Sequence, residues 1–123
     1  MNTLFPEITV LNAISPDEVR LVLHIPVQLT HFEGHFPELP ILPGVVQVDW
    51  AVTYARKHLP LTGEFIALEN LKFQGIVLPA ANIALHLSWN AAAKKLNFRY
   101  TDIDAADSAR VYSSGRIAFG GEA

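Results

Sequence analysis

The sequence predicts a single α+β domain in which one long helix is enclosed by a strongly curved antiparallel sheet. Three observations support this prediction: one long stretch of helical character, several segments with strand-like patterns, and short polar connections between the later segments. The chain has 123 residues, which is enough for one substantial core but too few for two. We therefore treat residues 1–123 as one domain.

The strand-like segments lie on both sides of the helical stretch. Residues 18–27 alternate apolar with mostly more polar side chains, the period-two pattern of a half-buried strand. Four later segments also have strand-like patterns and are separated by turn-like or polar residues: 64–73, 82–89, 94–101 and 110–119. The connections NAAAKK and TDIDAADS favour antiparallel neighbours. The expected order is strand, loop, helix and then four strands.

The helix is predicted to start at Pro43 and to continue to the residue before Pro60. Proline suits the first helical turn, and the basic residues of the segment RKH complement the negative end of the helix dipole. Apolar residues cover nearly every side of the first turns, so we expect the helix to be enclosed rather than to lie on a surface. Residues 30–44 hold two glycines and three prolines and are predicted to form an ordered loop.

Composition narrows the classes of function and the location. Half of the residues are hydrophobic and 17% are charged, below the usual value of roughly 25%, which favours a homo-oligomer. The net charge of −3 and nine scattered Lys and Arg residues argue against nucleic-acid binding. Cysteine is absent, so disulfides and thiolate metal sites are excluded. The sequence has neither a signal-peptide pattern nor a long apolar run, and we expect a cytoplasmic protein that does not span a membrane.

Asp49 is the most informative polar residue, because apolar residues surround it in the predicted helix. A poorly solvated carboxyl group tends to keep its proton near neutral pH and can then act as a general acid. The alternative is that Asp49 lies on a solvated stripe with Gln47, Thr53 and Arg56 and has no chemical role. The residues alone leave both interpretations open.

His35 is the candidate general base, because it lies in the rigid loop before the helix and histidine accepts a proton near neutral pH. A structural, hydrogen-bonding histidine is the alternative. His31 lies four residues earlier, but the loop lacks the helical spacing that would put both rings on one face, and we expect no metal site. Gly44 has a backbone N–H at the positive end of the helix, where it could hold an oxyanion or could serve only close packing.

The run from Phe32 to Asp49, FEGHFPELPILPGVVQVD, resembles the active-site segment of the bacterial 3-hydroxyacyl-[acyl-carrier-protein] dehydratases of the FabA/FabZ group, which have the hot-dog fold. The likeness includes the GHFP tetrapeptide, the P-I-x-P-G element that ends at Gly44, and an acidic residue fourteen positions after His35. The order of elements fits a hot-dog domain along most of the chain. The short chain and the sequence LPGVVQVDWAV look most like the ApeI-like dehydratases of aryl polyene pathways.

The resemblance implies a function, a site and a partner. His35 would be the base at the substrate α-carbon, Asp49 the acid that assists departure of hydroxide, and the N–H of Gly44 the donor to the thioester carbonyl. His35 and Asp49 of one site would come from opposite subunits of a dimer. The expected substrate is a 3-hydroxyacyl chain on the phosphopantetheine of acyl carrier protein, without a further cofactor. We expect the acyl tunnel to be lined by Phe36, Val45, Val48 and Val52.

An acidic carrier protein would require a local basic patch on this acidic chain. The candidates are Arg56 with Lys57, or Lys94 and Lys95 with Arg99, although each can also be ordinary solubilising charge.

The sequence departs from the family pattern at three places. Asp49 is as in FabA-like enzymes, whereas GHFP is as in FabZ-like ones; Glu38 replaces a frequent glycine, and Thr53 replaces a frequent glutamine. Two alternative functions stay open. One is a hot-dog thioesterase, which a base at the α-carbon disfavours. The other is a non-catalytic hot-dog subunit that binds carrier protein or pairs with an active partner, including in a heterodimer or a higher oligomer.

Overall fold

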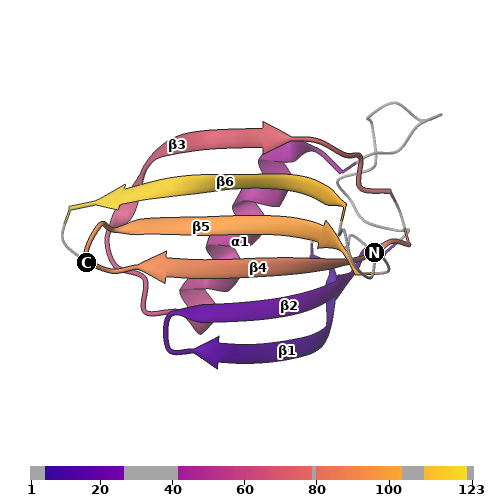
Figure 1. Ribbon diagram of the computed structural model, residues 1–123, viewed down its shortest axis with the longest axis horizontal. Coiled ribbons are helices and arrows are strands. Elements are labelled where there is room, and N and C mark those ends of the chain that lie inside the picture. Colours follow the sequence, from indigo (N-terminus) through magenta and orange to yellow (C-terminus); the bar gives the residue numbers. More distant parts are fainter. Residues whose placement is uncertain (1–4, 27–41, 79, 104–109, 122–123) are drawn as a thin grey trace.

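A six-stranded antiparallel sheet and one helix make up the described part of the chain. The computed structural model describes residues 5–26, 42–78, 80–103 and 110–121. In chain order, the elements are β1 (Glu7–Ser15), β2 (Glu18–His24), α1 (Gly44–His58), β3 (Glu64–Phe73), β4 (Asn82–Asn90), β5 (Lys95–Asp102) and β6 (Val111–Gly120). The strands lie side by side in the order β1-β2-β4-β5-β6-β3 (Figure 1). The predicted α+β class is confirmed.

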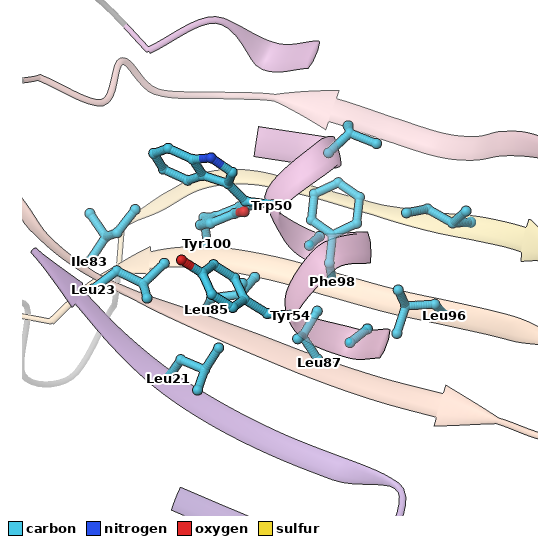
Figure 2. Close-up of a cluster of buried hydrophobic side chains, with 14 of the residues drawn as sticks. Leu21, Leu23, Trp50, Tyr54, Ile83, Leu85, Leu87, Leu96, Phe98 and Tyr100 are labelled. Atoms are coloured by element: carbon cyan, nitrogen blue, oxygen red, sulfur yellow. The ribbon is translucent and has the colours of Figure 1, made fainter. Parts of the chain in front are cut away.

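The sheet curves around α1, which lies across one of its faces (Figure 1). The inward side chains of β2, β4 and β5 alternate with outward ones, and the inward set packs against Trp50 and Tyr54 of the helix (Figure 2). Trp50 is 0% exposed. Full burial of one such large apolar side chain contributes about 1.5–3 kcal/mol, so this shared core holds the helix on the sheet.

The boundaries of α1 agree with the prediction. Pro43 precedes the first turn in an extended conformation, and the backbone N–H of Leu59 donates to the carbonyl oxygen of Ala55 at the other end. The four later strands are also found, with β4 paired to β5 and β5 paired to β6 as the short connections indicated.

The first strand, β1, was not predicted from the sequence. All nine of its residues are exposed, and among the described strands they pair with β2 alone, at the edge of the sheet. Two register irregularities interrupt the pairing, between Ile8 and Val10 and between Ala13 and Ser15. Because an edge strand without a buried face does not need alternating side chains, its sequence carries no clear period-two pattern.

The predicted wrapping of the helix by a curved sheet is confirmed, but among the described residues the sheet covers only one side of α1. The sheet covers the side of α1 that carries Trp50, Ala51, Tyr54 and Ala55, whereas Val45 on the opposite side is 76% exposed. The open side continues onto β3, whose large apolar residues are also exposed. The helix sequence is therefore apolar on a side that the described strands do not cover.

No helix in the described ranges combines the length and the apolar character needed to cross a membrane.

The buried tyrosines predict a loss of stability in alkali. Burial raises the pKa of Tyr54 to about 12 and the pKa of Tyr100 well above its ordinary value of 10. The unfolded chain releases these protons near pH 10 while the folded chain retains them, so the free energy of unfolding should fall as pH rises above 10. Each retained proton contributes a slope of about 1.4 kcal/mol per pH unit. Urea unfolding between pH 9 and 12 measures this slope.

The variants Tyr54→Phe and Tyr100→Phe should each flatten the alkaline slope, because each removes one titrating group. A slope that stays at the native value in both variants would show that other groups control alkaline unfolding.

Candidate active site

A pocket of about 520 Å³ lies between the open side of α1 and the edge strand β3. The helix contributes a stripe at the helical spacing i, i+3, i+4 and i+7, formed by Val45, Val48, Asp49 and Val52, and Gly44 lies at its first turn. The other wall consists of Phe65, Leu68, Leu71 and Phe73. The pocket thus holds one carboxyl group and one helix N-terminus within an otherwise apolar lining.

The helix N-terminus is held close to β3 at Gly44. A Cβ atom added to Gly44 would lie 2.5 Å from the nearest atom of the Phe73 ring, which only a shift of the ring or the helix could relieve. The N–H groups of Val46 and Gln47 donate to the carbonyl oxygen of Pro43. Within the described residues, the N–H of Gly44 has no such acceptor. This N–H lies at the positive end of the helix dipole and can stabilise negative charge on a bound group.

A buried hydrogen-bond network fixes this first turn to the sheet. Gln47 is 2% exposed, and its side-chain amide donates from Nε2 to the carbonyl oxygen of Leu42 at 3.2 Å. Its Oε1 accepts from the hydroxyl of Ser113 on β6 at 2.6 Å. Its backbone carbonyl accepts from the hydroxyl of Tyr100 on β5, also at 2.6 Å. The amide therefore ties together the helix, the segment that leads into it and the sheet.

Asp49 is exposed in the protomer, so the expectation that its carboxyl group is poorly solvated is wrong at this level of assembly. The alternative interpretation placed Asp49 on a solvated stripe together with Gln47. This is wrong for Gln47, because its side chain lies in the core. Asp49 instead shares its side of the helix with the apolar side chains Val45 and Val52. A substrate or a second subunit that covers this side would remove water from the carboxyl group.

The structure brings together five of the seven residues predicted for the site. Gly44, Val45, Val48, Asp49 and Val52 all line the pocket. His35 and Phe36 lie outside the described residues, as does His31.

Sequence reasoning missed the second wall of the pocket and the network beneath it. The wall residues Phe65 and Phe73 belong to a strand that was predicted from the sequence. The pattern of that strand does not show that it lies opposite the helix across the pocket. The signal for the network was Gln47 itself, a polar residue among apolar neighbours near a helix start. It was assigned to solvent because no local pattern shows that Ser113 lies next to it.

Comparison with known proteins decides the family. The sequence profile of the ApeI-like family, described as ApeI dehydratase, matches residues 12–116. The chain belongs to the ApeI-like dehydratase family. Two solved structures resemble this ApeI-like chain along nearly its whole length. One is the dehydratase heterocomplex ApeI:P from Xenorhabdus doucetiae, with a TM-score of 0.83, 30% identity and coverage of 94% of this chain and 98% of that one.

The other solved structure is an uncharacterized protein from Erwinia carotovora subsp. atroseptica. It has a TM-score of 0.82 and 35% identity, and the match covers 95% of this chain and 97% of that one. Among curated proteins, the 3-hydroxyacyl-[acyl-carrier-protein] dehydratase FabZ of Ruminiclostridium cellulolyticum is 32% identical over 95 residues, which are 72% of this chain and 66% of that protein. The corresponding dehydratase of Rhizobium etli is 33% identical over 76 residues.

The match to the Rhizobium etli protein spans about half of that protein's length, 49%. The profile match of the ApeI-like family, in contrast, includes both walls of the pocket and the network around Gln47. The resemblance carried by the segment from Phe32 to Asp49 is thus confirmed at the level of the family.

Proposed function

We propose that this ApeI-like chain removes water from 3-hydroxyacyl thioesters and produces trans-2-enoyl thioesters. The observation that carries the proposal is that Asp49 and the helix N-terminus at Gly44 line one apolar pocket in a chain of this family. An elimination beside a thioester needs an acid for the departing hydroxyl and a donor for the charge that develops on the carbonyl oxygen. These two groups supply both functions.

The proposed reaction proceeds as follows. The imidazole of His35 takes a proton from the substrate α-carbon, and negative charge develops on the thioester carbonyl oxygen, which accepts a hydrogen bond from the N–H of Gly44. The carboxylic acid of Asp49 gives its proton to the hydroxyl at the β-carbon as the C–O bond breaks. The α-carbon electron pair becomes the double bond, and water leaves. Return of the proton from imidazolium to carboxylate restores both groups.

The proposal requires a second subunit. Phe65, Ile66 and Phe73 of β3 are 47%, 63% and 51% exposed, and within the described ranges no strand pairs with the outer edge of this ten-residue strand. An exposed apolar edge strand is a ready surface for pairing with another chain. In the proposed dimer, a second β3 covers this edge and closes the pocket, and His35 comes from the partner subunit.

The covered pocket would also favour the form of Asp49 that the reaction uses, because removal of water favours a neutral carboxylic acid over a carboxylate. The apolar stripe of α1 and the wall of β3 would then enclose the acyl chain. We propose acyl carrier protein in the cytoplasm as the source of the substrate, in fatty acid or polyene-type biosynthesis.

Three of the five candidate carrier-binding residues have a hydrogen bond or an ion pair in the protomer. Lys94 donates to the carbonyl oxygen of Gly121, and Lys95 forms an ion pair with Glu69. Arg56 donates to the carbonyl oxygen of Gly63. To bind an acidic carrier protein, these residues would have to exchange their present contacts for contacts with carboxylates of the carrier.

The first experiment is a dehydration assay with 3-hydroxyacyl chains on a carrier protein, in which mass spectrometry detects the loss of one water. The purified homodimer should convert the substrate. The ApeI:P heterocomplex is a relative that contains a second chain, so the alternative is that this chain is active only with a different hot-dog subunit. Lack of turnover by the homodimer with several acyl groups would favour that alternative.

A subunit-mixing experiment tests whether one site uses two chains. His35→Ala and Asp49→Asn are each expected to be inactive as homodimers. Co-expression with two different tags yields a purified mixed dimer in which His35 of one chain faces Asp49 of the other at one site. This dimer should have about half of the native activity, because one of two symmetric sites is intact. An inactive mixed dimer would show that both residues of a site belong to the same chain.

A further inference from the structure

Two irregularities in the pairing of β3 decide which of its side chains face the pocket. The register of β3 on β6 shifts between Phe65 and Ala67 and again between Glu69 and Lys72, and β3 carries one extra residue at each shift. Such an extra residue is a β-bulge. Asn70 lies in the second bulge and has a left-handed backbone, with φ of 51°. Because side chains alternate between the two faces of a strand, each bulge reverses the face that the following side chains occupy.

The two bulges give the pocket an apolar wall. The residues of β3 that line the pocket are Phe65, Leu68, Leu71 and Phe73. Without bulges, the strand would place Ala67 and Glu69 on the same face as Phe65. Glu69 lies instead on the other face of the sheet, where it accepts two hydrogen bonds from Lys95. The first bulge thus brings Leu68 into the pocket in place of Glu69, and the second brings in Leu71 in place of Asn70.

Leu71 is the most firmly held residue of this wall. Its half-buried side chain packs against the hydrophobic core of the protomer. Phe65, Leu68 and Phe73 are 47%, 41% and 51% exposed and lie outside that core. A side chain that its neighbours hold in place can exclude a substrate group by its shape, whereas an exposed side chain can turn aside.

A notch in the inner face of the sheet holds Leu71 in place. The notch exists because Gly115 of β6 has no side chain. A Cβ atom at Gly115 would lie 3.0 Å from Cδ1 of Leu71 and 2.8 Å from the ring of Phe98. Phe98 is the partner of Gly115 on β5 and is 2% exposed. Leu71 therefore has the sheet and a buried ring directly behind it, and it cannot retreat from a bulky ligand.

Leu71 and Asp49 lie at a similar depth in the pocket. The ring of Phe73 lies against Gly44, which brings the end of β3 to the start of α1. From there the helix and the strand extend along the pocket in roughly opposite chain directions (Figure 1). Asp49 is five residues from Gly44, about 7.5 Å along a helix, and Leu71 is two residues from Phe73, about 7 Å along a strand.

We propose that Leu71 selects straight acyl chains over chains that carry a methyl branch at the fourth carbon. The inference rests on the proposed function, because that function places the hydroxyl of the third carbon beside Asp49 and the thioester carbonyl at Gly44. The fourth carbon then lies against Leu71, across the pocket from Asp49. A branch at this carbon needs volume that Leu71 occupies and cannot vacate.

The test measures binding first, so that its outcome does not depend on turnover. The ligands are the pantetheine thioesters of hexanoic acid and 4-methylhexanoic acid, which lack the hydroxyl and differ by one methyl group. Isothermal titration calorimetry should show that the native homodimer binds the branched thioester about tenfold more weakly. In Leu71→Ala the difference should shrink to about twofold or less. The matching 3-hydroxyacyl thioesters should show the same change in the ratio of kcat/KM.

Two further variants complete the design. Leu11→Ala is the matched control, because it removes the same side chain from an exposed position on β1, at the opposite edge of the sheet. Its preference for the straight thioester should equal the native one. Leu71→Val removes less volume and should give an intermediate preference, so the test remains decisive if Leu71→Ala does not fold. Circular dichroism checks the fold of each variant.

The outcomes separate this inference from the proposed reaction. A preference that stays at the native value in the folded Leu71 variants would overturn the inference, even if dehydration is found. The inference would also be overturned if the native homodimer bound both thioesters equally or bound neither. A preference that depends on Leu71 in a chain that releases no water from any 3-hydroxyacyl thioester would support the selection by Leu71 and contradict the proposed reaction.

Discussion

Replacement of Asp49 by asparagine is expected to lower kcat/KM for dehydration by about 100-fold to 10,000-fold, the range that a positioned general acid contributes. Asparagine has nearly the same shape and can still accept a hydrogen bond, but it has no proton of suitable acidity for the departing hydroxyl. The loss should appear mainly in kcat, because the apolar lining of the pocket that binds the acyl chain is unchanged. Steady-state kinetics with a carrier-linked substrate measures the effect.

The fold of the Asp49→Asn variant should be intact. Asp49 is exposed, and surface substitutions of this kind usually change the free energy of unfolding by less than about 0.5 kcal/mol. Asp17→Asn is the matched control, because it removes an exposed carboxylate in the turn between β1 and β2, far from the pocket in the fold. A native value of kcat/KM in the Asp49→Asn variant would show that Asp49 is not the acid of the proposed reaction.

Replacement of Gln47 by leucine is expected to be the most destabilising single change near the site. Leucine fills the space but leaves the hydroxyl of Ser113 and the carbonyl oxygen of Leu42 buried without this partner. Each unsatisfied buried group costs about 1–3 kcal/mol, so the free energy of unfolding should fall by roughly 2–4 kcal/mol. Urea unfolding measures the change, and Gln74→Leu, an exposed glutamine, is the matched control.

A double variant separates the network from general packing. If Gln47 and Ser113 act as one unit, Gln47→Leu/Ser113→Ala should be less destabilised than the sum of the two single variants, because no hydroxyl is then left unsatisfied. Simple additivity would show that the pair is not coupled. The folded fraction of the Gln47 variant should also have a reduced kcat, since the network sets the position of the Gly44 N–H in the pocket.

The candidate site could be predicted from the sequence to the extent that it lies on one continuous segment. Gly44, Val48 and Asp49 belong to the same helix, so the helical repeat already places them near one another. The second wall could not be predicted in this way. Phe65 and Phe73 approach the helix only because β3 pairs with β6 at the edge of the sheet, a long-range arrangement that no local pattern encodes.

Local periodicity was enough for most elements, because it reports which side of a segment is buried. The inward residues of β2 and β4 follow a period of two, and the helix shows no break between Gly44 and Pro60. Where burial does not alternate, the same reasoning failed. The exposed strand β1 was missed, and an enclosing layer was expected on a side of α1 that the described strands leave open.

The sequence by itself determined the fold class, the helix and its boundaries, and the family to which the chain belongs. Only the tertiary structure decided that Gln47 is buried, that β3 completes the pocket, and that two bulges turn Leu68 and Leu71 toward that pocket. The physical reason is the range of the interactions. Secondary structure responds to neighbours within a few residues, whereas strand register and burial depend on packing between residues that are distant along the chain.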